Sequence, residues 1–221
     1  KDAKKGDFYT AVIDKPARPA PVIIAQVLTE TIEKFPWPKS MRWGAGTLTW
    51  VRPLQSILCI LGGTVVPFAV GGIASSNTTE GHRFLSPGRL AVRDFADYRA
   101  KLDSAHVILD AADRVRMIGE QAEKMARANN LELVADDGLL TENAGLNEWP
   151  TVLIGTFDEA FLDVPPECLT TSMRSHQKCF SLRDPKTGRL ANKFLMVANL
   201  IAADGGAEIV TSDRLVVAGS A

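Results

Sequence analysis

The spacing of apolar residues near the start of the chain is that of an amphipathic helix. After Pro21, apolar residues recur every three or four positions as far as Phe35, and two prolines at 36 and 38 end the pattern. This predicts a helix of about 14 residues. Residues 1–20 mix charges with prolines, and we expect an entry segment or linker there.

The next segment has the shorter period of β-strands. Residues 56–61 and 64–70 are β-rich runs joined by a Gly-Gly dipeptide, which tolerates the positive φ angles of a tight hairpin. Serine, asparagine and threonine at 75–79 predict a polar loop that leads into the string GHRF at 81–84.

Helical spacing returns at Asp94 and again after Asp110, which predicts two successive helices, the second ending near residue 129. Further runs predict a strand at 151–157, a helix opened by proline at 165–175, and strands at 177–183 and 189–200 around a turn at 184–188. Because helices and strands do not alternate regularly, we expect an α+β fold with a mixed sheet, hairpins and several helices. One main domain over 21–210, with a frayed end at 211–221, is the simplest organisation.

Composition limits the class of protein. A chain of 221 residues, 46% hydrophobic and 23% charged, can bury a sizeable core. Its longest apolar run, 56–72, is interrupted by glycines and a proline, so no membrane span is expected. Three cysteines leave one thiol over under any pairing, which favours a reducing compartment and a cytoplasmic location.

Charge is distributed unevenly between the two halves of the chain. The formal net charge is -1, which is not the strongly basic balance of a free-standing nucleic-acid binder. Residues 1–100 carry 13 Lys/Arg against 8 Asp/Glu (net +5), whereas residues 101–221 carry 12 against 18 (net -6). The two halves are therefore expected to face different partners.

Motifs for autonomous catalysis are absent from the sequence. It contains no Gly-x-x-x-x-Gly-Lys-Ser/Thr run and no strand-linked Gly-x-Gly-x-x-Gly. Cys168, His176 and Cys179 would supply at most three zinc ligands, so neither a metal site nor a cofactor is predicted within the chain. A hydrolase would need Cys179 beside His82 or His176 and a carboxylate, and period-two spacing places Cys179 on the opposite face of a strand from Phe180.

Three polar clusters are candidate binding sites. Between positions 34 and 52, cations alternate with aromatic residues, a combination that can neutralise phosphates and stack on exposed bases of RNA. The same residues also suit a core plugged by tryptophan under a solvated surface. His82-Arg83 and the string at 174–178 can each bind phosphate or form a structural hydrogen-bonding knot.

Several strings resemble, in order, the β subunit of bacterial heterotetrameric glycyl-tRNA synthetases. They are FPWPKSMRWG (35–44), WVRPL (50–54), NTT (77–79), GHRFL (81–85), EWP (148–150), FDEAFL (157–162), MRSHQK (173–178) and FLMVAN (194–199). The matches span residues 22 to 210, and the chain looks like an internal segment from the N-terminal half of a longer subunit.

The resemblance implies a division of labour. In this family the α subunit holds the active site that activates glycine with ATP and Mg, while the β subunit contributes to recognition of tRNA-Gly and is required for aminoacylation. The fragment itself is then non-catalytic and binds no cofactor. Its implied partners are the α subunit, the remainder of the β subunit and tRNA-Gly, with no membrane.

Four departures from the family pattern matter. Gln55 stands where histidine is expected, Glu80 where a basic residue usually precedes GHRF, and Cys179 where tyrosine is usual. The end of the chain is also altered at 211–213. The carboxylate at position 80 weakens the case for a phosphate clamp in that loop.

We therefore expect the chain to engage tRNA or hold subunits together. The rivals are a structural scaffold without RNA contact and an editing-type hydrolase. If Arg42 and Arg83 are buried and paired, the scaffold is favoured, because a protein rarely keeps a buried charge without a partner. If both side chains are exposed, RNA binding is favoured. The candidate nucleic-acid contacts are Trp37, Lys39, Arg42, Trp43, Arg52, His82, Arg83, Arg174, His176, Gln177 and Lys178.

Overall fold

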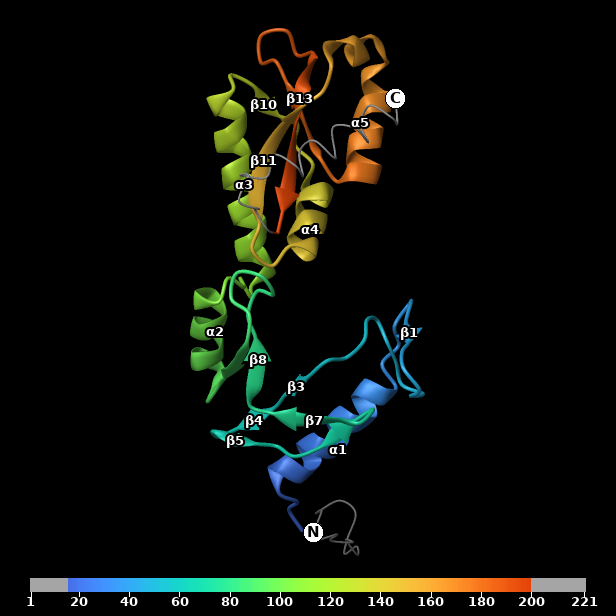
Figure 1. Ribbon diagram of the computed structural model, residues 1–221, viewed down its shortest axis with the longest axis vertical. Helices are drawn as coiled ribbons and strands as arrows, with labels where there is room; N and C mark the ends of the chain where they lie inside the picture. Colours follow the sequence, from blue (N-terminus) through green and yellow to red (C-terminus); the bar gives the residue numbers. More distant parts are fainter. Residues whose placement is uncertain (1–15, 200–221) are drawn as a thin grey trace, which may run out of the picture. The chain divides into compact units, whose positions relative to one another are not determined.

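The computed structural model describes residues 16–199, and contacts within the chain divide it into two compact units, Lys1–Thr79 and Glu80–Ala221. We call their described parts unit 1 (16–79) and unit 2 (80–199) (Figure 1). Both units mix helices and strands, which confirms the α+β class. The hydrophobic pattern gave no sign of this boundary, and organisation as one main domain over 21–210 stays a prediction. The end at 211–221 lies outside the described residues.

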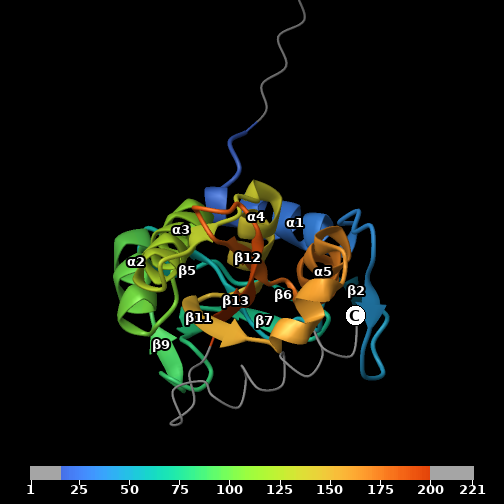
Figure 2. The ribbon, with the colours of Figure 1, turned by 90° about the horizontal axis from the view of Figure 1, so that it is seen from above.

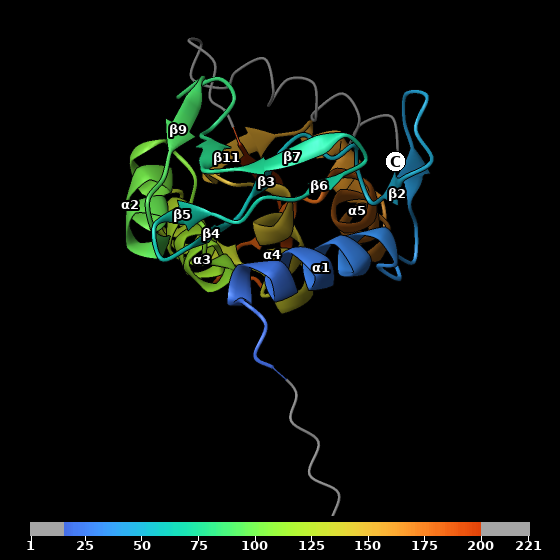
Figure 3. The same cartoon turned by 90° about the horizontal axis from the view of Figure 1, so that it is seen from below.

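Unit 1 combines one helix with short strands in its described part. The predicted helix is confirmed as α1 (Ala20–Glu33), 14 residues long with proline in its first turn, and it contacts β6 of a small three-stranded sheet (Figure 3). The strands are β1 (Met41–Arg42), β2 (Thr49–Trp50), β3 (Ile57–Leu58), β4 (Ile60–Leu61), β5 (Thr64–Val65), β6 (Ala69–Val70) and β7 (Ile73–Ser76).

Only the tip of the predicted hairpin forms as expected. Strands β4 and β5 pair antiparallel around Gly62 and Gly63, whose φ angles are 56° and 80°. The hairpin is shorter than expected because Pro67 has no amide hydrogen with which to continue a ladder. Strands β3 and β6 instead pair with β7, the first in parallel and the second antiparallel.

The prediction of a polar loop at 75–79 is wrong. These residues complete β7 and begin β8 (Thr78–Glu80), the strand that leads into unit 2. The hydroxyl of Ser75 donates to the carbonyl of Val66 and accepts from the amide of Phe68, so this polar side chain joins neighbouring segments and does not mark a turn.

Unit 2 is built on a four-stranded antiparallel sheet in the order β10-β12-β13-β11. Strand β8 pairs separately with β9 (Arg89–Ala91). The other elements are α2 (Phe95–Ser104), α3 (Ala111–Ala128), β10 (Glu132–Leu133), α4 (Asp137–Leu146), β11 (Thr151–Thr156), the 3-10 helix η1 (Glu159–Asp163), α5 (Pro166–Ser172), the π-helix η2 (Met173–Gln177), β12 (Phe180–Arg183) and β13 (Leu190–Ala198).

Most of these elements confirm the predictions from the sequence. Asp94 and Asp110 cap α2 and α3 as expected. Strand β12 begins three residues later than predicted because η2 extends the helical segment through Gln177. The pattern gave no prediction for β10 or α4.

The sheet of unit 2 separates two apolar cores. Figure 2 shows α3 and α5 on opposite sides of β12 and β13. Leu195 of β13 packs with residues of α3 and α4, whereas its neighbours Phe194 and Met196 pack with residues of α5 and η2. Phe180 and Cys179 likewise fall in different cores, which confirms that they face opposite sides of the sheet.

A glycine and a phenylalanine face each other in the middle of the sheet. Gly155 of β11 pairs with Phe194 of β13, and both residues are buried. A Cβ atom at position 155 would meet the Phe194 ring at 2.2 Å. The ring therefore occupies the space that a side chain on β11 would need, and Phe157 stacks beside it with 6.4 Å between ring centroids.

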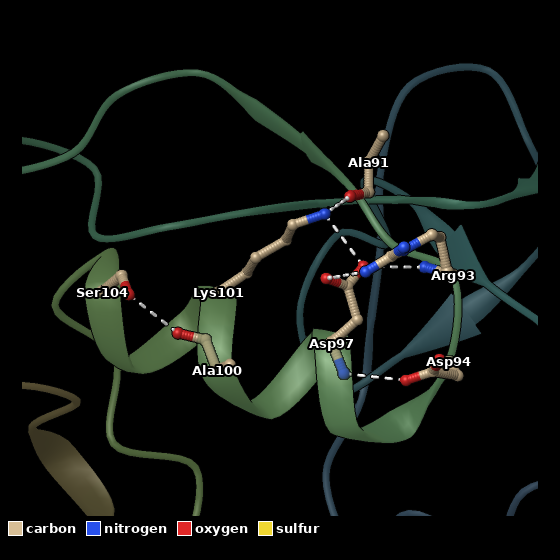
Figure 4. A network of polar contacts seen from close by, with 7 residues as sticks. All are labelled: Ala91, Arg93, Asp94, Asp97, Ala100, Lys101 and Ser104. Atoms are coloured by element: carbon tan, nitrogen blue, oxygen red, sulfur yellow. Dashed lines mark hydrogen bonds and ion pairs between the residues drawn. The ribbon is translucent and has the colours of Figure 1, made fainter.

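A charged network fixes the start of α2 to the preceding strand (Figure 4). Asp97 accepts hydrogen bonds from the Lys101 ammonium at 2.8 Å and from the Arg93 amide at 3.0 Å. Lys101 also donates to the carbonyl of Ala91 in β9. The hydrogen bond from Lys101 lowers the pKa of Asp97 to about 2, with Arg93 adding to the effect.

Candidate functional site

The predicted contact residues fall into both units. Among the described residues, no hydrogen bond or ion pair joins the pair His82-Arg83 directly to the string at 174–178. Unit 1 contains Trp37, Lys39, Arg42, Trp43 and Arg52, and unit 2 contains His82, Arg83, Arg174, His176, Gln177 and Lys178.

The aromatic residues of unit 1 form a cluster. The ring of Trp37 lies 4.5 Å from that of Phe35 and 4.9 Å from that of Trp50, measured between centroids. The indole nitrogen of Trp37 is buried without a hydrogen-bond partner within residues 16–199. Trp37 therefore serves as packing within unit 1, while Phe35 remains 45% exposed and Trp43 is half-buried.

The cations of unit 1 that were predicted to contact nucleic acid have no carboxylate partner among the described residues. Lys39, Arg42 and Arg52 are exposed, and none forms an ion pair with another described residue. No aspartate or glutamate occurs in the sequence between 34 and 79. Their positive charge is therefore not neutralised locally and is available to an anionic ligand.

His82, by contrast, is a structural residue of unit 2. Its ring is 1% exposed, and Nδ1 accepts hydrogen bonds from the amides of Phe84 at 3.2 Å and Leu85 at 3.1 Å. Because Nδ1 is an acceptor, the neutral ring carries its hydrogen on Nε2 and donates it to the Asn199 carbonyl at 2.8 Å. These bonds occupy both ring nitrogens, which leaves neither one for a phosphate.

Three of the strings that carry the resemblance meet at His82. The side-chain oxygen of Asn199 accepts from the amides of Glu148 at 2.8 Å and Trp149 at 2.9 Å. The His82 amide donates to the carbonyl of Ala105, at the end of α2. The sequence offered no signal for this meeting, because 117 positions separate His82 from Asn199.

Arg83 is exposed at the tip of the same loop. Its guanidinium carbon lies 5.6 Å from the centroid of the Phe84 ring, and Phe84 is 64% exposed. Arg83 has no carboxylate partner in the part of the chain that the structure describes. Phe84, which was not among the predicted contacts, is thus presented to solvent beside an unpaired cation.

The cations at 174–178 are already paired. Arg174 donates to Asp136 at 2.5 Å, and Lys178 lies 2.7 Å from Glu142. The hydrogen bond from Arg174, followed by that from the Leu139 amide, lowers the pKa of Asp136. Both acids come from the α4 region, which the sequence pattern did not predict, so the pairing was missed.

Backbone geometry holds the same string in place. Lys178 adopts a left-handed conformation, with φ 56°, and its carbonyl accepts from the Asn143 side chain at 3.0 Å. Gln177 is half-buried and His176 exposed. His176 lines a shallow hollow together with residues of α5, and Cys179 lies in the buried core and is not among the residues lining the hollow. The hydrolase arrangement is therefore not formed here.

Residues 16–199 offer neither a metal-binding cluster nor a membrane-spanning helix. No three of their histidine, cysteine, aspartate and glutamate side chains are placed so that they could hold one metal ion. None of their helices is long and apolar enough to cross a membrane.

Comparison with known protein families shows to which family the chain belongs. The model of the family described as glycyl-tRNA synthetase beta subunit matches residues 1–219 of this chain. The chain belongs to this family. The resemblance read from the strings at 35–44, 81–85 and 173–178 is thereby confirmed.

Curated relatives agree with this assignment. A glycine--tRNA ligase beta subunit from Ruegeria sp. (strain TM1040) is 54% identical over 98% of this chain, and one from Cereibacter sphaeroides (strain ATCC 17029 / ATH 2.4.9) is equally similar. The corresponding protein of Paracoccus denitrificans (strain Pd 1222) is 51% identical over 99% of the chain. The chain spans 32% of the length of each of these relatives.

Proposed function

We propose that this chain contributes to binding of tRNA-Gly in a glycine-tRNA ligase, an aminoacyl-tRNA synthetase of the cytoplasm. It acts as part of a β subunit, together with the remainder of that subunit and an α subunit. The α subunit binds glycine, ATP and Mg and joins glycine to tRNA. The chain itself holds no cofactor and performs no chemical step.

One observation in unit 1 supports the RNA contact. Lys39, Arg42 and Arg52 are exposed and unpaired, in a stretch from 34 to 79 that contains four cations and no carboxylate. Phosphate binding by cations of this kind releases counterions and gives salt-dependent affinity. Arg174 and Lys178 are weaker candidates because each must first leave a carboxylate partner.

The scaffold alternative is supported by a different observation. The hydrogen bonds of His82 and Asn199 join the loop at 81–85, the end of α2 and the segment around Glu148 within unit 2. This cluster stabilises structure. Arg42 and Arg83, however, are exposed and unpaired within residues 16–199, which is the condition that favours RNA over a scaffold.

The test is fluorescence anisotropy of the assembled ligase with labelled tRNA-Gly, a non-cognate tRNA and a DNA duplex over a series of salt concentrations. Arg42→Ala should weaken tRNA binding and flatten the logarithmic salt slope by about 0.7 to 0.9, the value for one lost phosphate contact. Lys39→Ala and Arg52→Ala are expected to act in the same direction.

The matched control is Arg116→Ala in α3. Arg116 is also exposed, but it is paired with both Asp113 and Glu120, so its replacement should leave the slope unchanged. Unchanged slopes for all three unit 1 variants would remove this surface from the tRNA-binding site and favour the scaffold.

A further inference from the structure

We propose that Phe84 is a stacking platform for an unpaired nucleobase of RNA, with Arg83 beside it as the contact for the neighbouring phosphate. This inference rests on the proposed function and adds a base-binding site in unit 2. It is carried by the way in which the loop at 81–86 is built.

The loop is rigid at its base. Gly81 lies so close to α2 that an added Cβ would come within 2.6 Å of the Ala105 Cβ and 3.0 Å of its carbonyl oxygen. The His82 amide donates to that carbonyl, and the Ser86 amide donates to the His82 carbonyl, each at 2.9 Å. Few alternative backbone positions are open to such a loop.

The buried histidine determines what the loop presents. Its Nδ1 accepts from the amides of Phe84 and Leu85, which fixes the backbone of both residues. The Phe84 side chain is nevertheless 64% exposed, and Leu85 is 41% exposed. The loop thus uses a buried, fully bonded side chain to hold a large aromatic ring in water, which contributes little to the folding of unit 2.

Arg83 indicates the chemistry of the ligand. Its guanidinium lies near the Phe84 ring and has no carboxylate partner among residues 16–199. A flat ring next to an uncompensated planar cation matches a base and its phosphate, because the ring stacks on the base and the guanidinium binds the anion. Every base offers a π-face, so this contact needs an unpaired nucleotide but no particular sequence.

Phe95 provides a matched control. It is 70% exposed in the same unit, at the first residue of α2, and its ring neighbour is Tyr98 at 6.4 Å with no cation over its face. If exposed aromatic area alone promoted RNA binding, Phe95 would contribute as much as Phe84.

The experiment measures binding of a tRNA-Gly transcript to the assembled ligase by anisotropy. Phe84→Ala should weaken binding about 5- to 150-fold, the range for loss of one base stack, with the salt slope unchanged. Phe84→Leu should weaken binding similarly because leucine has no π-face, and Phe84→Trp should restore it. Arg83→Ala should instead flatten the salt slope by about 0.7 to 0.9.

Several outcomes would overturn the inference. Wild-type affinity in Phe84→Ala, while Arg42→Ala binds weakly, would exclude the base site and leave the proposed function standing. Equal losses in Phe84→Ala and Phe95→Ala would show a nonspecific effect. Loss of the α subunit from Phe84→Ala on size-exclusion chromatography would assign the loop to protein docking. Wild-type binding in every variant would remove the proposed function as well.

Discussion

At the scale of single residues, burial separates the two candidate histidines. His82 is 1% exposed and bonded through both ring nitrogens, whereas His176 is exposed at the surface of η2. The two residues have the same chemistry and both lie in strings that carry the family resemblance. Only the structure assigns the first to the framework and leaves the second available to a ligand.

This difference predicts the stability of two variants. His82→Ala removes an acceptor for two amides and a donor to Asn199 and leaves a cavity, so we expect the free energy of unfolding to fall by about 2 to 4 kcal/mol. His176→Ala should change it by no more than about 0.5 kcal/mol. Urea unfolding followed by circular dichroism measures both, and equal effects would contradict the structural role of His82.

At the scale of secondary structure, the Asp97 network makes the attachment of α2 sensitive to acid. The hydrogen bond from Lys101 lowers the folded-state pKa of Asp97 to about 2, below the usual value for an aspartate. A carboxyl with a lowered pKa stabilises the fold above its unfolded pKa and loses that effect as it is protonated. The contribution is therefore present above about pH 4 and lost between about pH 4 and pH 2.

Asp97→Asn should abolish this pH dependence. The variant should have a lower Tm than the wild type at pH 7, and the difference should shrink as the pH falls from 4 to 2. Asp163→Asn is the control, because Asp163 is an exposed carboxylate without an ion pair to any residue in the range 16–199. A Tm difference for Asp97→Asn that stays constant with pH would show that the carboxylate charge does not matter.

The elements that sequence predicted well are those with local signals. Capping aspartates marked α2 and α3, a proline marked the start of α5, and paired glycines marked the tip of the β4–β5 hairpin. Helix α4 was missed because its apolar residues do not form a clear stripe, although Leu139 and Ala144 are buried in the core. Strand β7 was missed because Ser75 and Ser76 satisfy their hydroxyls within the sheet.

For the candidate site, the sequence predicted which residue types are present but not which of them are paired or buried. The sequence showed cations and aromatic residues, but which cations are already neutralised depends on partners far along the chain. Asp136 lies 38 positions from Arg174, and Glu142 lies on a helix that was not predicted. The roles of Trp37 and His82 likewise depended on burial, which residue spacing does not determine.

At the scale of the whole molecule, the two units differ in charge. Unit 1 has five Lys/Arg and two Asp/Glu, whereas unit 2 has 15 Lys/Arg and 18 Asp/Glu. Nine of the 15 Lys/Arg residues of unit 2 form ion pairs with carboxylates of the described residues, so the surface of unit 2 attracts polyanions less. Phosphate contacts are therefore expected to concentrate in unit 1, and Arg83 is the contact that we propose in unit 2.

The units also differ in the size of their cores. Within residues 16–199, unit 1 contributes three of the 23 buried apolar residues and unit 2 the other twenty, and α1 contains no buried residue. Segments with few buried contacts open at lower free energy. Hydrogen exchange measured by mass spectrometry should therefore show faster exchange in α1 and β4–β5 than in β11 and β13. Equal protection in both units would contradict this ranking.

The facing pair Gly155 and Phe194 also bears on how the chain selects one pairing of its strands. A shift of β11 by two residues would preserve the alternation of faces but place Leu153 or Phe157 where the ring needs an empty position. Such a misaligned β11–β13 pair is disfavoured, because two side chains would compete for one volume. The absence of a side chain at 155 thus favours a single register between β11 and β13, because only glycine leaves room for the Phe194 ring.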